Sequence, residues 1–255
     1  MAVERGFSDH YGTMAGKYAD YRPNYPATLF ERIAQAAPGR RRCWDCATGN
    51  GQAAVGLVAH FDEVIATDAS AAQIAHAVSL DGVSYRCEPA EATSLLDASI
   101  DAVTVAAALH WLDRPKFFAE VRRVCRPGAL IAIWTYTTRF EVSAVVDPVL
   151  EHYARDVLGP YWPPGSDVVA NGYRDVELPF DELPSPALAI REPWTLHRLV
   201  GYLNTWSAAG RFRAALDRPA TDAIVESLER AWGPADESRE VVVPLTVRLA
   251  RVSQR

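Results

Sequence analysis

The sequence has little cysteine, no long hydrophobic run and no excess of positive charge, and each shortage excludes a class of protein. Four of its 255 residues are cysteine, and they occur in or beside apolar runs, so we expect no disulfide framework. No run approaches the roughly 18 apolar residues that a membrane helix needs, and the first residues lack the apolar core of a signal peptide. We therefore expect a cytoplasmic protein with no membrane partner.

The charge balance argues against a nucleic-acid partner. The chain carries a net charge of −6 at pH 7, so it has no general attraction for phosphate backbones. Its densest basic cluster, Arg40 to Arg42, is only three residues long and is typical of a solvated loop before a strand. We expect a small-molecule substrate, and the sequence leaves the oligomeric state open.

An alternation of strands and helices runs through the first half of the chain. Hydrophobic residues make up 49% of the chain, enough to bury the core of one large domain. Short apolar runs alternate with helical patterns between residues 43 and 136, which indicates βαβ units and a parallel sheet. The expected strands are 43–45, 64–67, 83–87, 102–107 and 129–134, and the expected helices are 53–60, 71–78 and 115–124.

The pattern changes after Tyr136. We expect a helix over 142–157, a loop rich in proline and glycine over 159–165, helices over about 196–208 and 217–232, and a last strand over 241–249. The chain then forms a single domain, 1–255, with four parts. They are an N-terminal helical lid (1–37), a cofactor-binding core (38–136), a substrate cap with later core elements (137–240) and the final strand (241–255).

A turn of small residues between the first strand and its helix predicts a cofactor site. The run from Asp45 to Gly51 has no large side chain, so the backbone can approach a ligand closely. Asp68 ends the second strand 17 residues after Gly51, near the spacing at which a carboxylate accepts hydrogen bonds from ribose hydroxyls. Together these features indicate a nucleoside-containing cofactor.

Oxidoreductases bind their dinucleotide cofactors with a similar turn. Gly49-x-Gly51-x-x-Ala54 also satisfies the dinucleotide pattern of nicotinamide- or flavin-dependent oxidoreductases. Asp45 argues against them, because a carboxylate there repels a pyrophosphate and attracts the ammonium of a methionine group.

The chain resembles class I S-adenosylmethionine-dependent methyltransferases of the type 11 group, and within them the trans-aconitate methyltransferase-like subfamily. The resemblance implies an α/β fold: a Rossmann-like, mostly parallel seven-stranded sheet with helices on both faces and an inserted helical cap after the fifth strand. It is carried by Tyr18, Arg22-Pro23, Tyr25-Pro26, the turn 45–51, Asp68, Pro89-Ala90-Glu91, Ala107 to Trp111, and Thr205-Trp206-Ser207.

The resemblance also implies S-adenosyl-L-methionine as the cofactor and a set of residues that bind it. The same residues fit a second alternative, a protein that binds S-adenosylmethionine without catalysis. The first glycine of the family's turn is Ala47 in this chain, where a methyl group would be tolerated only if φ is negative; an aspartate of the family is replaced by Pro89. The implied cofactor-binding residues are Tyr18, Arg22, Asp45, Ala47, Gly49, Gly51, Asp68, Ala69, Gln73, Ala90, Glu91, Ala107, Leu109 and His110.

His110 is a candidate catalytic residue that positions the acceptor, because it follows the fourth strand at the edge where open α/β sheets bind ligands. A packed structural histidine is the alternative. We expect Trp111, Tyr136 and Trp206 to bind the substrate, and the resemblance implies methylation of a small organic acid on oxygen. Cys43-x-x-Cys46 has no second pair and no nearby histidine, so we predict no metal site.

Overall fold

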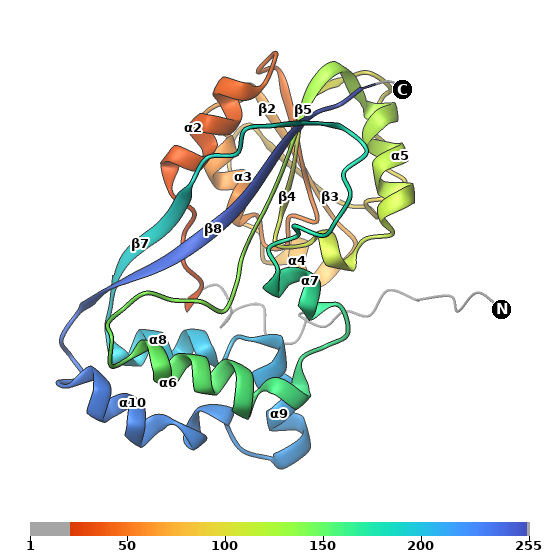
Figure 1. The fold of residues 1–255 in the computed structure, drawn as a ribbon. Coiled ribbons are helices and arrows are strands. Elements are labelled where there is room, and N and C mark those ends of the chain that lie inside the picture. Colours follow the sequence, from red (N-terminus) through yellow and green to blue (C-terminus); the bar gives the residue numbers. More distant parts are fainter. Residues whose placement is uncertain (1–20, 254–255) are drawn as a thin grey trace.

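One eight-stranded sheet organises the fold in the computed structural model, which describes residues 21–253 (Figure 1). Strands β1 to β5 are parallel and β8 is antiparallel to β5, in the order β3-β2-β1-β4-β5-β8-β6. This is the Rossmann-like α/β arrangement expected from the sequence. The strands are β1 (Arg42–Cys46), β2 (Glu63–Asp68), β3 (Val83–Cys87), β4 (Ile100–Ala106), β5 (Cys125–Tyr136), β6 (Asp181–Leu183), β7 (Leu188–Trp194) and β8 (Arg239–Arg251).

The edge of the sheet next to β8 is made of two short strands rather than one. β6 pairs with residues 249–251 of β8 and β7 pairs with residues 239–245. Leu245 pairs with β5 on one side and with β7 on the other, so β6 and β7 share one edge and the sheet is seven strands wide. The predicted width is therefore confirmed. The two edge strands were not predicted, because β7 contains Pro193 and charged residues, which only an edge strand tolerates well.

Helices cover both faces of the sheet, as expected. Side chains alternate along β5: Leu130, Ala132 and Trp134 belong to one hydrophobic cluster, and Ile131 and Ile133 belong to the other. The first cluster includes α2 (Ala27–Ala36) and α3 (Gln52–Leu57), and the second includes α5 (Arg114–Val124). α4 (Ala71–Ala75) is shorter than the helix predicted over 71–78.

The segment after β5 forms a helical cap that shares the first cluster. Figure 1 shows α6, α8, α9 and α10 gathered beyond one end of the sheet. Inside this lobe the rings of Phe140 and Trp206 stack with centroids 5.9 Å apart. The helices of the lobe are α6 (Asp147–His152), α8 (Leu196–Leu203), α9 (Ser207–Leu216) and α10 (Val225–Trp232). The short helix α7 (Ser166–Ala170), from the same part of the chain, instead contacts β5 and the turn after β4.

Several boundaries in the cap differ from the sequence-based predictions. The helix expected over 142–157 begins at Asp147, with Pro148 in its first turn, and continues as a π-helical segment, Tyr153–Val157. The helix expected over 217–232 begins at Val225, after a 3₁₀ turn. α7 and α9 were not predicted.

The order of the strands creates the place for a ligand. From β1 the chain moves outward through β2 and β3, and then returns to place β4 on the other side of β1. In open α/β sheets such a reversal leaves a crevice at the carboxyl ends of the two central strands. Among residues 21–253, no helix is long and apolar enough to cross a membrane.

Candidate active site

The turn after β1 places three residues in left-handed backbone conformations. Ala47, Gly49 and Gly51 have φ angles of +53°, +60° and +88°, and α3 begins directly afterwards. A β-carbon at Gly51 would overlap the hydroxyl of Tyr85 on β3. The turn therefore needs glycine at this position, and it leaves peptide groups rather than side chains at the edge of the sheet.

Ala47 does not have the negative φ at which its methyl group would be tolerated without strain. At φ +53° its β-carbon crowds the following carbonyl oxygen, at a cost of roughly 1–2 kcal/mol. Ala107, which follows β4, has the same conformation with φ +49°. Because β1 and β4 are paired, two strained alanines follow the carboxyl ends of neighbouring strands, and strain of this kind is typical of functional sites.

Replacing Ala47 with glycine should raise the free energy of unfolding by about 0.5–1 kcal/mol. Relief of the left-handed strain exceeds the additional entropy that glycine brings to the unfolded chain. Urea denaturation measures the change. Ala72→Gly in α4 is the control, since it should lower stability by roughly 0.5–1 kcal/mol, and a loss of stability in Ala47→Gly would contradict the strain.

Asp45 is fully buried behind the turn. Its Oδ2 accepts a hydrogen bond of 2.5 Å from the hydroxyl of Thr48, and its Oδ1 accepts one of 2.7 Å from the hydroxyl of Thr104 on β4. Burial raises the pKa of Asp45 to about 6, and the negative charge of Asp68 also raises it. Its carboxylate therefore holds the turn in place and titrates close to neutral pH.

Asp68 connects the end of β2 to the turn. Its Oδ2 accepts a hydrogen bond of 2.8 Å from the N–H of Gly49, and its Oδ1 accepts one of 2.8 Å from the N–H of Ser70. The Ser70 hydroxyl in turn accepts a hydrogen bond from the N–H of Gln73 and caps α4. Gln73 also faces the turn, since its Oε1 would lie 3.8 Å from a β-carbon at Gly49. The structure therefore brings these predicted residues together.

The remaining predicted cofactor residues differ in what they offer to a ligand. Ala90 is buried, and the Glu91 carboxylate accepts a hydrogen bond of 2.9 Å from the N–H of Asp113. Leu109 lies in the 3₁₀ turn after β4, and its fully buried side chain packs in the second hydrophobic cluster, so it holds this turn in place and does not face a ligand. Tyr18, and most of the lid predicted over 1–37, lie outside the described residues.

His110 lies on the same 3₁₀ turn and contacts the cap. Its Nδ1 is 2.8 Å from the hydroxyl oxygen of Tyr173, and its ring lies 4.5 Å from that of Trp111. Burial lowers the pKa of His110 to about 4, so the imidazole is neutral at pH 7. The side chain therefore carries both a donor and an acceptor nitrogen but no charge.

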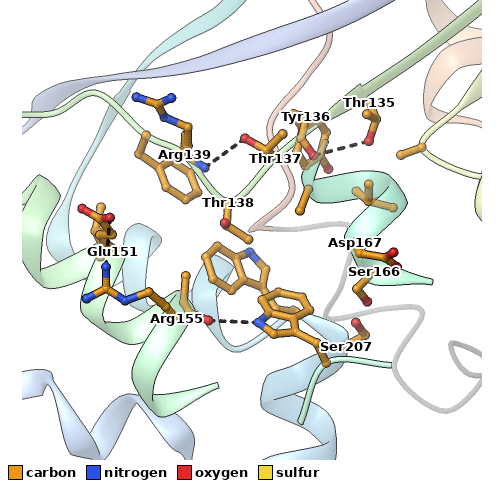
Figure 2. Close-up of a pocket in the computed structure, with 18 of the residues that line it drawn as sticks. Thr135, Tyr136, Thr137, Thr138, Arg139, Glu151, Arg155, Ser166, Asp167 and Ser207 are labelled. Atoms are coloured by element: carbon orange, nitrogen blue, oxygen red, sulfur yellow. Dashed lines mark hydrogen bonds and ion pairs between the residues drawn. The ribbon is translucent and has the colours of Figure 1, made fainter. Parts of the chain in front are cut away.

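A cavity of about 900 Å³ lies between the carboxyl edge of the sheet and the cap. Ala107 and His110 line it from the segment after β4, and residues 135–141 line it from the end of β5 and the segment that follows. Figure 2 shows Ser166, Asp167 and Ser207 across the cavity from Glu151 and Arg155. Cavities of this size enclose small organic ligands, and the mixture of aromatic and hydroxyl side chains suits one with an apolar body and polar groups.

All three predicted substrate residues, Trp111, Tyr136 and Trp206, line this cavity. Phe140, Tyr202 and Trp162 also line it but were not predicted. Trp162 could have been found from the sequence, because it stands beside Tyr161 in the loop rich in proline and glycine over 159–165. Phe140 and Tyr202 had no signal of their own, since they come from segments that only the folded cap brings together.

Arg22 joins the N-terminal segment to the cavity wall. Its guanidinium donates a hydrogen bond of 2.7 Å to the hydroxyl of Tyr136 and one of 3.4 Å to the carbonyl oxygen of Thr205. It also lies over the ring of Tyr202, 5.5 Å from the ring centroid. The structure thus places a cation beside the cavity, at a position where it can meet either the cofactor or the substrate.

The thiols of Cys43 and Cys46 do not form a reactive pair. Both side chains are fully buried, and burial raises the pKa of each thiol well above its usual value. Among the described residues, no group of three histidine, cysteine or acidic side chains is arranged to hold a metal ion.

Comparisons with known proteins identify the family. Residues 44–133 match the methyltransferase domain family. A solved structure from Anaeromyxobacter dehalogenans, assigned as a type II methyltransferase, is 39% identical, covers 92% of this chain and 99% of its own, and superposes with a TM-score of 0.86. The chain belongs to the methyltransferases. It is an S-adenosylmethionine-dependent enzyme, and the turn, Asp68 and the neighbouring cavity fit that cofactor.

More distant methyltransferases share most of the chain. A protein from Dictyostelium discoideum assigned as a methyltransferase is 28% identical over 242 residues, which is 92% of this chain and 91% of its own. An uncharacterised methyltransferase from Mycobacterium tuberculosis is 33% identical over 159 residues, which is 60% of this chain and 62% of its own. These relatives favour methyl transfer over the oxidoreductase alternative. They do not support the assignment of this chain to the trans-aconitate methyltransferase-like subfamily.

Proposed function

We propose that this methyltransferase esterifies a carboxylate of a small molecule held in the cavity between the sheet and the cap. The observation that carries the proposal is the position of Arg22 on the cavity wall that also contains Ala107 and His110. A guanidinium there favours an anionic acceptor, and the aromatic walls accommodate its apolar body. The acidic side chains of the cavity are partly engaged: Glu151 pairs with Arg155 at 3.3 Å, and Asp147 accepts hydrogen bonds from two peptide N–H groups.

The work of the protein in this reaction is alignment and exclusion of water. Bound along the turn, S-adenosylmethionine supplies an electrophilic methyl group. Asp68 and the peptide groups of Gly49 and Gly51 would hold it at the carboxyl edge, and Ala107 and His110 would border both ligands. An acceptor carboxylate is ionised at pH 7, so its oxygen forms the bond to carbon as the carbon–sulfur bond breaks, and no proton has to move.

The four parts predicted from the sequence correspond to these tasks. The core over 38–136 would bind the cofactor, and the cap within 137–240 would bind the acceptor. The final strand would close the sheet, and the N-terminal segment, including Arg22, would cover the cofactor.

A methyl-transfer screen tests the proposed acceptor. The purified protein is incubated with methyl-labelled S-adenosylmethionine and pairs of small molecules that differ only in a carboxylate, an alcohol, a phenol or an amine. We expect label in the carboxylate members and its release as methanol in alkali, because methyl esters hydrolyse there and methyl ethers and methylamines do not. Transfer to phenols or amines alone would contradict the proposal.

Asp45 should make cofactor binding depend on pH. Its pKa of about 6 in the free protein would fall when the ammonium of the cofactor lies nearby, so binding below pH 6 requires the loss of a proton. We expect the dissociation constant to rise up to roughly tenfold per pH unit as the pH falls below 6.

Calorimetry with S-adenosylhomocysteine between pH 5 and 8 measures this dependence. Asp45→Asn should flatten the profile, and Asp62→Asn, at the opposite end of β2, should leave it unchanged. An identical profile in wild type and Asp45→Asn would show that Asp45 does not sense the cofactor.

A further inference from the structure

Tyr173 connects the cap to His110 from a fixed position. It follows α7, it is 1% exposed, and its φ of +60° is unusual for an aromatic residue. Its N–H donates to the carbonyl oxygen of Val168, and its own carbonyl accepts a hydrogen bond of 2.7 Å from Arg248 on β8. The ring is therefore held by its backbone on both sides, and its hydroxyl is presented to the imidazole at 2.8 Å.

We propose that the Tyr173 hydroxyl donates its hydrogen bond to Nδ1 of His110 and so fixes the histidine as the tautomer that carries its proton on Nε2. A phenol is a much stronger hydrogen-bond donor than a neutral imidazole N–H, and the imidazole lone pair is a stronger acceptor than a phenol oxygen. In the opposite assignment, Nδ1–H of His110 donates to the hydroxyl oxygen of Tyr173, which joins the weaker donor to the weaker acceptor. At a contact this short and buried, the stronger pairing dominates.

The fixed tautomer determines what His110 can do in the cavity. Its Nδ1 is engaged by Tyr173, so Nε2 is the nitrogen left for a ligand, and in this tautomer it can donate but cannot accept a proton. The low pKa of the ring keeps it neutral, in agreement with this role. His110 then positions an acceptor oxygen by a hydrogen bond, and Tyr173 is a positioning residue that acts through it.

This inference rests on the proposed function and makes it more specific. A donor at Nε2 suits an acceptor that arrives ionised, such as a carboxylate, and it gives no base for an alcohol or a phenol. The Tyr173 contact joins the segment after α7 to the turn after β4, and α7 itself also contacts this turn. The same part of the chain therefore lines the acceptor cavity and orients the His110 hydrogen-bond donor.

Nitrogen NMR of protein labelled at histidine tests the tautomer without any turnover. His110 is one of six histidines, and its signals are identified by their loss in His110→Gln. In the wild type we expect a protonated Nε2 and an unprotonated Nδ1 at pH 7. Tyr173→Phe should give a mixture of both tautomers and an upward shift of the His110 pKa, because the lost hydrogen bond stabilised only the neutral ring.

Tyr161→Phe, elsewhere in the cap, is the matched control and should change neither property. A wild-type spectrum with the proton on Nδ1 would overturn the proposal, and so would a Tyr173→Phe variant whose His110 pKa falls or stays the same. The tautomer measured by NMR does not depend on the identity of the acceptor. If His110 is fixed with its proton on Nε2 and the enzyme methylates phenols, the carboxylate proposal is refuted and the tautomer proposal stands. With an acceptor in hand, Tyr173→Phe should lower kcat several-fold and leave KM for S-adenosylmethionine unchanged.

Discussion

Asp68→Ala should weaken the binding of S-adenosylmethionine and S-adenosylhomocysteine by roughly 10- to 150-fold, or about 1.5–3 kcal/mol. The variant would lose charge-assisted hydrogen bonds to the ribose hydroxyls. The variant would also lose the two hydrogen bonds of 2.8 Å that the Asp68 carboxylate accepts from the N–H groups of Gly49 and Ser70. The turn itself would therefore loosen. Isothermal titration calorimetry with either ligand measures the effect.

Two variants separate the contributions to this loss. Asp68→Asn keeps one carbonyl oxygen as an acceptor and removes the charge, so we expect an intermediate affinity. Asp62→Ala removes a carboxylate just before β2, at its opposite end, and should bind the cofactor like the wild type. Equal affinity in wild type and Asp68→Ala would exclude Asp68 from the cofactor site.

Gly51→Ala should lower cofactor affinity by about 30-fold or more. A β-carbon at φ +88° costs roughly 1–2 kcal/mol, and its overlap with Tyr85 adds about 1–3 kcal/mol unless the turn moves. The peptide groups that would meet the methionine end then leave their positions. Equilibrium binding of S-adenosylhomocysteine, with urea denaturation in parallel, measures both consequences.

Gly128→Ala is the matched control for Gly51→Ala. Gly128 has φ +76°, and a β-carbon there meets no atom within 4 Å, so it adds the backbone strain without the overlap. It lies in β5 beside Arg126 and Pro127, away from the carboxyl edge. Gly128→Ala should therefore lose stability and keep its cofactor affinity. If both variants lose affinity equally, general destabilisation accounts for the effect.

The sequence predicts the core of the fold well because burial there leaves a simple pattern. β1, β2 and β4 are each buried along most of their length and are largely apolar, as parallel strands covered on both faces must be. In the cap, helices are held by contacts between distant segments. α9 and the edge strand β7 therefore have no periodic signal strong enough to stand out, and Pro148 moves the start of α6 inward.

The candidate site divides in the same way. Asp68 and His110 could be predicted because Asp68 ends β2 and His110 follows the end of β4, and the topology brings such ends to one edge. Tyr173 could not, since its contact with His110 joins residues 63 positions apart through a short helix in the cap. The left-handed φ of Ala47 was also beyond prediction, because alanine is a poor residue for that conformation and only the surrounding turn imposes it.

Titration of the wild-type protein with S-adenosylhomocysteine in a calorimeter tests most directly that the turn after β1 is a methyltransferase cofactor site. The structure predicts saturable binding of one molecule per chain at pH 7.5, and no heat of binding with NADH under the same conditions. Binding of NADH without binding of S-adenosylhomocysteine would contradict this account.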